Sequence, residues 1–245
     1  MNINAIVATR MTSSRLPGKV LLDLAGKPAL VHLIERLKRS KYLNEIVIAT
    51  TTNQTDDVVV ETAKSQGVSY YRGSEEDVLL RTVEAAEATA TDLILQVTSD
   101  CPLIDHETID AVIERICEHS YIDYAANQLV KTYPLGFSVE AFRTKELRLV
   151  EQTIKDPAVR EHVSLYFYEH PERYCLSNVE APHFLHHPEY RLTLDTEEDY
   201  RLIRNIYEAL YPVKPAFDLY EITRYLQRNC RMQSINQHVK QKKAR

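Results

Sequence analysis

The sequence lacks the features that mark membrane, secreted and zinc-binding proteins. No apolar run approaches the roughly 20 residues that a membrane-spanning helix needs, so no membrane span is predicted. The N-terminus enters a strand pattern directly, without the pattern of a signal peptide. The four cysteines are scattered and form no metal-type pair: Cys101, Cys117, Cys175 and Cys230. Together these absences predict a cytoplasmic protein in a reducing compartment.

Glycine is also scarce, and nothing in the sequence reads as a flexible linker. The 245 residues include five glycines, and no internal repeat or low-complexity segment interrupts them. This length suits one sizeable core. We therefore expect residues 1–245 to form a single domain, with an excursion at about 130–190 that carries substrate or subunit contacts. Whether the protein forms a homodimer stays open.

The charge balance argues against nucleic acid as the main partner. The formal net charge is −5 at pH 7, whereas proteins that bind nucleic acid non-specifically are basic. One short basic run closes the chain at residues 240–245. It is predicted to be a frayed, solvated tail.

Strand and helix patterns alternate through the first half of the chain. Apolar runs predict strands over residues 3–8, 45–51, 68–71, 92–98 and 121–126. Helical patterns lie between them, over residues 28–38, 56–66, 75–90 and 108–119. Alternation with short links predicts an α/β fold with a mostly parallel, doubly wound sheet and helices on both faces.

The second half is less regular. A turn and a strand are expected within residues 131–142, helices over 145–154 and 159–168, and strands over 174–179 and 190–194. A helix then runs to about Leu210, with Asp195 as a candidate cap ahead of an acidic first turn. A last helix is expected over residues 218–229.

The loop from Arg10 to Lys19 is the strongest candidate for a binding site. It follows the first predicted strand, and open α/β sheets bind ligands at the carboxyl ends of their strands. The loop holds three cations, the Ser13–Ser14 pair and Gly18; the cations are Arg10, Arg15 and Lys19. Fixed charges, small donors and a close-approaching backbone suit a polyphosphate. The alternative is a solvated basic turn.

Two further loops are expected at the same edge of the sheet. Arg72-Gly73-Ser74 reads as a turn whose backbone and hydroxyl groups are able to read a base edge, with Arg81 in the following helix. An ordinary turn is the alternative there.

Gln96 and Asp100 lie four residues apart across the end of a strong strand. Facing a phosphate loop, Asp100 is a candidate ligand of Mg²⁺, which takes one or two carboxylates plus phosphate oxygens; alternatively it caps a turn before Pro102.

Asp195 follows a short predicted strand and has two interpretations. It is either a second metal ligand or the N-cap of the following helix, or both.

Zinc is not favoured at His183, His186 and His187, because no carboxylate or cysteine is suitably spaced. For Glu161-His162 a surface or interface role is favoured over catalysis, and for Cys101 packing. No Gly-x-Ser-x-Gly elbow or Walker loop is present.

These motifs together resemble the sugar-acid cytidylyltransferases, the family that includes the CMP-Kdo and CMP-sialic acid synthetases. The resemblance is carried by the Ala8–Lys19 loop and by several supporting motifs, and it covers roughly residues 3 to 210. The SpsF-like branch, named for a spore coat polysaccharide biosynthesis protein, fits best. Its pattern is matched by Glu76-Asp77-Val78-Leu79-x-Arg81, Pro134-x-Gly136, Arg160-Glu161-His162-Val163 and Arg191-Leu192-Thr193-Leu194-Asp195.

The resemblance implies a Rossmann-like α/β/α sandwich of the nucleotide-diphospho-sugar transferase type. It implies transfer of CMP from CTP to a sugar acid with release of pyrophosphate and with Mg²⁺ as cofactor, in surface or spore-coat polysaccharide biosynthesis. Carried over by position, the residues that bind the nucleotide are Arg10, Ser13, Ser14, Arg15, Lys19, Gly73, Ser74, Arg81 and Gln96. The metal ligands are Asp100 and Asp195, and the catalytic residues are Arg10, Lys19 and Asp100.

The match is incomplete on the acceptor side. Thr98-Ser99-Asp100-Cys101 departs from the small-residue pair usual before the Pro-Leu of the Kdo and sialate enzymes, and the sugar-binding segment has no residue-by-residue match after about Asn127. The identity of the sugar stays open. Two alternatives remain: a nucleotide-sugar-dependent glycosyltransferase, whose usual Asp-x-Asp is absent, and a non-catalytic nucleotide-binding member of a glycan-assembly complex.

Overall fold

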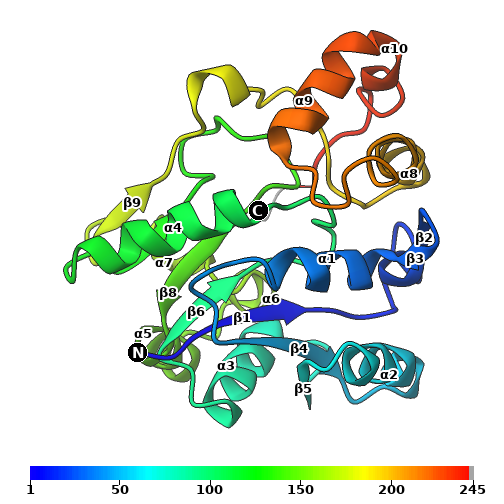
Figure 1. The fold of residues 1–245 in the computed structure, drawn as a ribbon. Helices are drawn as coiled ribbons and strands as arrows, with labels where there is room; N and C mark the ends of the chain where they lie inside the picture. Colours follow the sequence, from blue (N-terminus) through cyan, green and yellow to red (C-terminus); the bar gives the residue numbers. More distant parts are fainter. Residues whose placement is uncertain (243–245) are drawn as a thin grey trace.

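A seven-stranded sheet forms the centre of the protein, as seen in a computed structural model that describes residues 1–242 (Figure 1). The strand order is β5-β4-β1-β6-β8-β7-β9. The strands are β1 (Ile3–Ala8), β4 (Glu45–Thr51), β5 (Ser69–Gly73), β6 (Leu93–Gln96), β7 (Tyr124–Ala126), β8 (Glu140–Arg143) and β9 (Leu176–Asn178). Only β8 runs antiparallel to its neighbours in this sheet. The mostly parallel α/β sheet is therefore confirmed.

Helices cover both faces of the sheet because the strands bury apolar side chains on both sides. Along β1, Ile3, Ala5 and Val7 join one core cluster, whereas Ile6 joins the other. The first cluster includes buried side chains of α1 (Ala29–Leu37), α2 (Asp57–Ser65), α4 (His106–Glu118), α8 (Glu197–Leu210) and α9 (Leu219–Arg228). The second includes those of α3 (Val78–Ala88), α5 (Thr144–Thr153), α6 (Pro157–Glu161) and α7 (Leu165–Glu169). No helix within residues 1–242 has the length and apolar character to cross a membrane.

Several of the predicted elements in the first half begin or end elsewhere: the strands expected over residues 92–98 and 121–126 are the shorter β6 and β7. Arg72 and Gly73 are not turn residues, because they pair with Thr50 and Thr51 at the end of β5. The following helix starts at Val78 and not at Glu75, since the Asp77 carboxylate accepts the backbone N–H of Leu80 at 2.9 Å and caps α3 there. A small hairpin, β2 (Asp23–Leu24) with β3 (Lys27–Pro28), was not predicted.

The second half departs further from the predicted pattern. The helix expected over 159–168 is split into α6 and α7, and residues 190–194 do not form a strand. A single bridge between Leu135 and Arg191 replaces that strand. The short helix α10 (Cys230–Gln233) was not predicted. The basic tail is not simply frayed at its start, because Gln241 accepts a hydrogen bond from Arg191. Residues 243–245 of that tail lie outside the described part of the chain.

Strand β1 marks the point where the direction of strand addition reverses. It pairs in parallel with β4 on one side and with β6 on the other. At such a switch point the loops after neighbouring strands diverge and leave a crevice at the carboxyl ends. The Arg10–Lys19 loop follows β1, and Thr98–Cys101 follows β6. The two motifs predicted to cooperate therefore begin side by side.

Candidate active site

A cleft of about 520 Å³ lies at this edge of the sheet. Both halves of the chain line it. The first half contributes Ala8, Thr9, Arg10, Ser13, Ser14, Arg15, Lys19, Val78, Arg81, Thr98, Ser99, Asp100 and Cys101. The second half contributes Leu135, Gly136, Ser138, Glu140, Glu161, His162, Thr193, Asp195, Gln241 and Lys242. The excursion at 130–190 thus supplies side chains to the same cleft as the opening loop.

The opening loop is fastened at both of its ends. At its start, the fully buried Asp56 carboxylate accepts the Met11 backbone N–H at 2.8 Å and the Thr50 hydroxyl at 3.0 Å. At its end, Gly18 donates its N–H to the Met11 carbonyl at 2.9 Å and adopts φ +71°, a conformation that glycine tolerates best. The short 3₁₀ helix Lys19–Leu21 follows. These anchors fix the points from which the loop cations reach into the cleft.

Lys19 lies between two carboxylates. Its Nζ is 2.8 Å from Asp195 Oδ1 and 3.4 Å from Asp100 Oδ2. Arg15 approaches the other oxygen of Asp195, at 2.9 Å. Burial alone would lower the pKa of Lys19, but attraction to Asp100 and Asp195 outweighs it, so the pKa is raised. Burial acts to raise the pKa of Asp100, yet the charge of Lys19 holds it below its usual value. Lys19 and Asp100 therefore both carry their charges at neutral pH.

The backbone holds the two carboxylates together. The carbonyl of Asp100 accepts the Leu194 N–H at 2.8 Å and the Thr193 hydroxyl at 3.2 Å, which fastens the end of β6 to the segment before Asp195. The Asp100 carboxylate faces Lys19, its nearest charged partner.

Asp195 does not cap the following helix, so that interpretation was wrong. The N-cap of α8 is Thr196, which forms a capping box with Asp199. Arg191 lies behind Asp195: its Nε and Nη2 each bind Asp199 at 2.8 Å, and Nη2 is 3.4 Å from Asp195 Oδ2. The Asp195 side chain is 4% exposed. Because Thr196 caps the helix, the Asp195 carboxylate is able to face Lys19 and Arg15.

A close backbone approach at Gly136 sets the position of this segment. The Leu192 N–H donates to the Leu135 carbonyl at 2.7 Å. Gly136 adopts φ +102°, and a Cβ placed there would lie 2.4 Å from the Leu192 carbonyl carbon. Backbone atoms cannot yield as a flexible side chain does, so only glycine fits.

We expect Gly136→Ala to destabilise the protein strongly. Overpacking costs about 1–3 kcal/mol, and a left-handed backbone costs a further ~1–2 kcal/mol. For a chain of this size that corresponds to a fall in Tm of roughly 4–20 °C, measurable by circular dichroism. Gly26→Ala is the matched control, since Gly26 has φ +87° but nothing within 4 Å of its Cβ position. Equal losses in the two variants would contradict the close-approach argument.

The structure brings together most of the residues predicted for the site. Those that line the cleft are Arg10, Ser13, Ser14, Arg15, Lys19, Arg81, Asp100 and Asp195. Gly73, Ser74 and Gln96 are not among the lining residues. Gly73 and Ser74 instead support Arg81. A Cβ on Gly73 would lie 3.0 Å from Arg81 Cγ, and the Ser74 carbonyl accepts a hydrogen bond from the Arg81 guanidinium. Gln96 lies within β6, and its buried Oε1 has no hydrogen-bond partner among the described residues.

Arg81 is the unusual cation of the cleft. It is 2% exposed, and its Nε has no hydrogen-bond partner among the described residues. Burial lowers its pKa, and the charge of nearby Arg10 lowers it further. A buried guanidinium with an unused donor is costly unless a ligand satisfies it. Arg81 therefore places a buried, incompletely hydrogen-bonded guanidinium at the cleft wall.

Several lining residues were not predicted. Glu161 and His162, expected at the surface or an interface, lie on the cleft. Glu140 also lines it, and burial raises its pKa despite a hydrogen bond from the Tyr124 hydroxyl at 3.0 Å. Cys101 is buried, as predicted for packing, and burial raises the pKa of its thiol.

Within residues 1–242 no group of three or more His, Cys, Asp or Glu side chains is placed to hold a metal ion. This finding covers the three histidines at 183–187.

The two carboxylates nevertheless suit a hard divalent cation. The Lys19 ammonium already occupies the space between Asp100 and Asp195 as a cation. Mg²⁺ takes one or two protein carboxylates and completes its shell with phosphate oxygens and water. A pair of carboxylates beside loop cations therefore matches a metal that arrives together with a polyphosphate.

Comparisons with known proteins agree with this picture. A family model described as Cytidylyltransferase matches residues 4–232. The spore coat polysaccharide biosynthesis protein SpsF of Bacillus subtilis is 35% identical over 231 residues, which cover 91% of this chain and 93% of that protein. The 3-deoxy-manno-octulosonate cytidylyltransferase of Geobacter sulfurreducens is 30% identical over 194 residues, 69% of this chain and 76% of that one.

Solved structures give the same answer at the level of the fold. The structure of a cytidylyltransferase from Leptospira borgpetersenii superposes with a TM-score of 0.90 at 30% identity and covers 99% of this chain and 100% of its own. The structure of CMP:2-keto-3-deoxy-manno-octonic acid synthetase complexed with CTP gives a TM-score of 0.63 at 17% identity, over 84% of this chain and 98% of that one. The second likeness supports the Rossmann-like fold alone.

Proposed function

This chain belongs to the cytidylyltransferase family and is a nucleotidyltransferase, and from that premise we propose that it transfers CMP from CTP to a sugar acid with release of pyrophosphate. The observation that carries the proposal is the position of Lys19 between Asp100 and Asp195, beside a loop of cations in one cleft. The names of two relatives, one in spore coat polysaccharide biosynthesis and one acting on 3-deoxy-manno-octulosonate, support an acidic sugar of a surface polysaccharide as the acceptor.

The loop cations are proposed to bind the triphosphate. Arg10, Arg15 and Lys19 supply positive charge, and Ser13 and Ser14 supply hydroxyl donors. Phosphoryl-type transfer depends on positioning and charge neutralisation more than on covalent catalysis. In the proposed reaction, a hydroxyl oxygen of the acceptor bonds to the α-phosphorus, the bond to the β-phosphate oxygen breaks, and the hydroxyl proton is released. Lys19 and Arg10 stabilise the negative charge that pyrophosphate carries away.

Asp100 and Asp195 are the proposed ligands of Mg²⁺. When bound, the ion neutralises phosphate charge and polarises the phosphoryl oxygens. Both carboxylates contact Lys19, and Asp195 also contacts Arg15. Arg81 is proposed to contact the nucleotide, supported from behind by Gly73 and Ser74, because its Nε lacks a partner in the cleft wall.

A pyrophosphate-release screen tests the proposal. The protein is mixed with CTP, Mg²⁺ and a panel of sugar acids that includes 3-deoxy-manno-octulosonate, with metal-free and acceptor-free controls. We expect pyrophosphate only when CTP, Mg²⁺ and one acid are present together. Release of nucleoside diphosphate from a nucleotide-sugar would support a glycosyltransferase instead. CTP binding without turnover on any acid would support a non-catalytic nucleotide-binding protein.

A further inference from the structure

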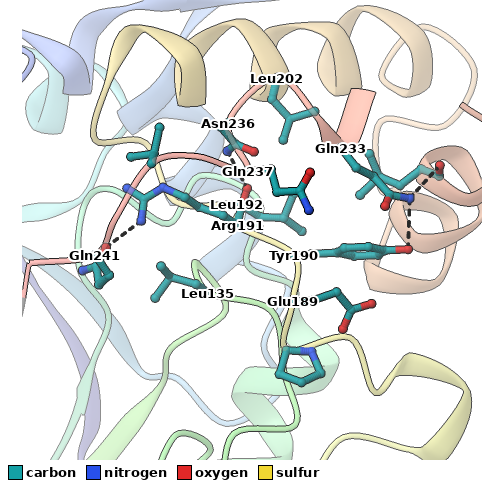
Figure 2. A pocket seen from close by; sticks show the side chains of 13 residues that line it. Leu135, Glu189, Tyr190, Arg191, Leu192, Leu202, Gln233, Asn236, Gln237 and Gln241 are labelled. Atoms are coloured by element: carbon teal, nitrogen blue, oxygen red, sulfur yellow. Dashed lines mark hydrogen bonds between the residues drawn. The ribbon is translucent and has the colours of Figure 1, made fainter. Parts of the chain in front are cut away.

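The last described residues fold back onto the active-site region. We name Ser234–Lys242 the C-terminal strap. Its anchor is Asn236, which is 2% exposed and donates from Nδ2 to Asp199 Oδ1 at 2.8 Å and to the Arg191 carbonyl at 2.9 Å. Figure 2 shows Asn236 and Gln241 of the strap on either side of the Arg191 side chain, around a cavity of about 200 Å³. A buried, doubly bonded amide holds the strap in place.

The strap reaches the catalytic cleft at its far end. Gln241 Oε1 accepts a hydrogen bond from Arg191 Nη1 at 2.7 Å, and Gln241 and Lys242 both line the cleft. The match to the family model ends at residue 232, before the strap begins. The strap therefore adds side chains from beyond the family match to the cleft, in a region that the Leptospira structure also covers, since that superposition spans 99% of this chain.

Charge is divided unequally between the two halves of the cleft lining. The described residues of the first half contribute four Lys and Arg side chains against one carboxylate, Asp100. Those of the second half contribute three acidic side chains, Glu140, Glu161 and Asp195, and a single lysine, Lys242. An acidic acceptor beside the second half would meet repulsion from these carboxylates unless a cation offsets it.

Lys242 is placed to offer that cation. Its Nζ lies 4.0 Å from Glu161 Oε1, and both side chains are mostly exposed, at 73% and 52%. Such an exposed pair is weak, so the ammonium is available to a substrate carboxylate. The cations of the first half are engaged elsewhere, because Arg15 and Lys19 face Asp195 and the others are assigned to the nucleotide.

We propose that the C-terminal strap forms part of the acceptor site, with Lys242 binding the carboxylate of the acidic acceptor and Gln241 positioning Asp195 through Arg191. This inference rests on the proposed cytidylyltransferase activity. It assigns a substrate-binding residue and a positioning residue to a segment outside the family match.

The role of Lys242 is tested by steady-state kinetics with the acid that the wild-type protein accepts. We expect Lys242→Ala to raise the KM for the acid about tenfold, as loss of a charge-assisted contact implies, while the KM for CTP stays unchanged. Lys242→Arg keeps the charge and restores most of the affinity. Lys240→Ala is the matched control on the same exposed segment. An unchanged KM for the acid in Lys242→Ala overturns the acceptor role.

Gln241 has a readout that does not need an acceptor. We expect Gln241→Leu to weaken Mg²⁺-dependent CTP binding about threefold to tenfold in isothermal titration, because Arg191 loses a partner and holds Asp195 less firmly. Gln241→Glu keeps an oxygen opposite Arg191 and retains the affinity. Unchanged binding in Gln241→Leu overturns the positioning role.

The two experiments separate this inference from the proposed function. If the wild-type protein releases no pyrophosphate with any acid, the proposed function fails, and with it the acceptor role of Lys242. If the wild type turns over an acid and Lys242→Ala does so with the same KM, the strap's acceptor role fails alone. The titration with Gln241→Leu decides the positioning role in either case.

Discussion

Replacing Lys19 by alanine is expected to lower kcat/KM for pyrophosphate release by about 10²–10³, the loss typical when one preorganised electrostatic group is removed from a transition-state site. The physical reason is its position: the ammonium lies 2.8 Å from Asp195 and 3.4 Å from Asp100, and the Lys19 side chain is only 12% exposed. Without it, Asp100 loses its ion-pair partner and repels the incoming phosphates, while Asp195 keeps only Arg15 and Arg191. Stopped or coupled pyrophosphate assays at saturating Mg²⁺ measure the effect.

A surface lysine provides the comparison for this variant. Lys27 forms an ion pair with Glu35 at 2.5 Å, away from the cleft lining, so Lys27→Ala is expected to leave kcat/KM within about twofold. Circular dichroism of Lys19→Ala shows whether the fold persists. A folded Lys19→Ala with near wild-type kcat/KM would refute the placement of the triphosphate at the opening loop.

The sequence predicts well those parts of the fold that depend on local pattern. The runs at residues 3–8 and 45–51 match β1 and β4 to the residue, because both are buried parallel strands and read as continuous apolar runs. The end of α2 follows from Gly67, which has a φ of +63°, because helices commonly end at a glycine in the left-handed conformation. The loop at residues 10–19 stands out because its cations, hydroxyls and glycine are close together in the sequence.

Residues brought in by long-range pairing are beyond such reasoning. The segment at 190–194 is apolar enough to suggest a strand, but in the structure it meets Leu135 through one bridge only. In the sequence, Asp195 resembles an N-cap because an Asp before an acidic first turn is a common capping pattern. The structure shows instead that Thr196 is the N-cap and forms a capping box with Asp199. Glu140 and Gln241 carry no local motif, and their places on the cleft follow from the antiparallel pairing of β8 and the return of the strap.

These long-range features converge on one arrangement of charge. Asp56 and Gly18 fasten the loop that carries the cations, whereas Gly136 and the Asp100 carbonyl fasten the segment that carries Asp195. Each half of the site is thus fixed by contacts within the protein itself. Preorganisation of this kind spares the reaction the cost of orienting dipoles and charges at the moment of transfer.

The carboxylate of Asp100 gives the second large prediction, because its charge has opposite consequences with and without metal. We expect Asp100→Asn to lower kcat by about 10²–10³ in the presence of Mg²⁺, since a neutral amide binds a hard cation poorly. In the absence of metal, the same variant is expected to bind CTP more tightly than the wild type. The amide removes a negative charge near the phosphates and releases Lys19 from its 3.4 Å contact.

This reversal of sign separates a metal-binding role from a merely structural one. A structural role predicts weaker CTP binding under both conditions, because a distorted loop would lose phosphate contacts whether or not metal is present. Isothermal titration with Mg²⁺ and with EDTA measures both affinities. Asp110→Asn is the matched control: Asp110 is also largely buried, accepts a hydrogen bond from Ser40 at 2.5 Å and lies outside the cleft lining. If Asp100→Asn weakened CTP binding equally in Mg²⁺ and in EDTA, Asp100 would hold the fold of the β6 end and not the metal.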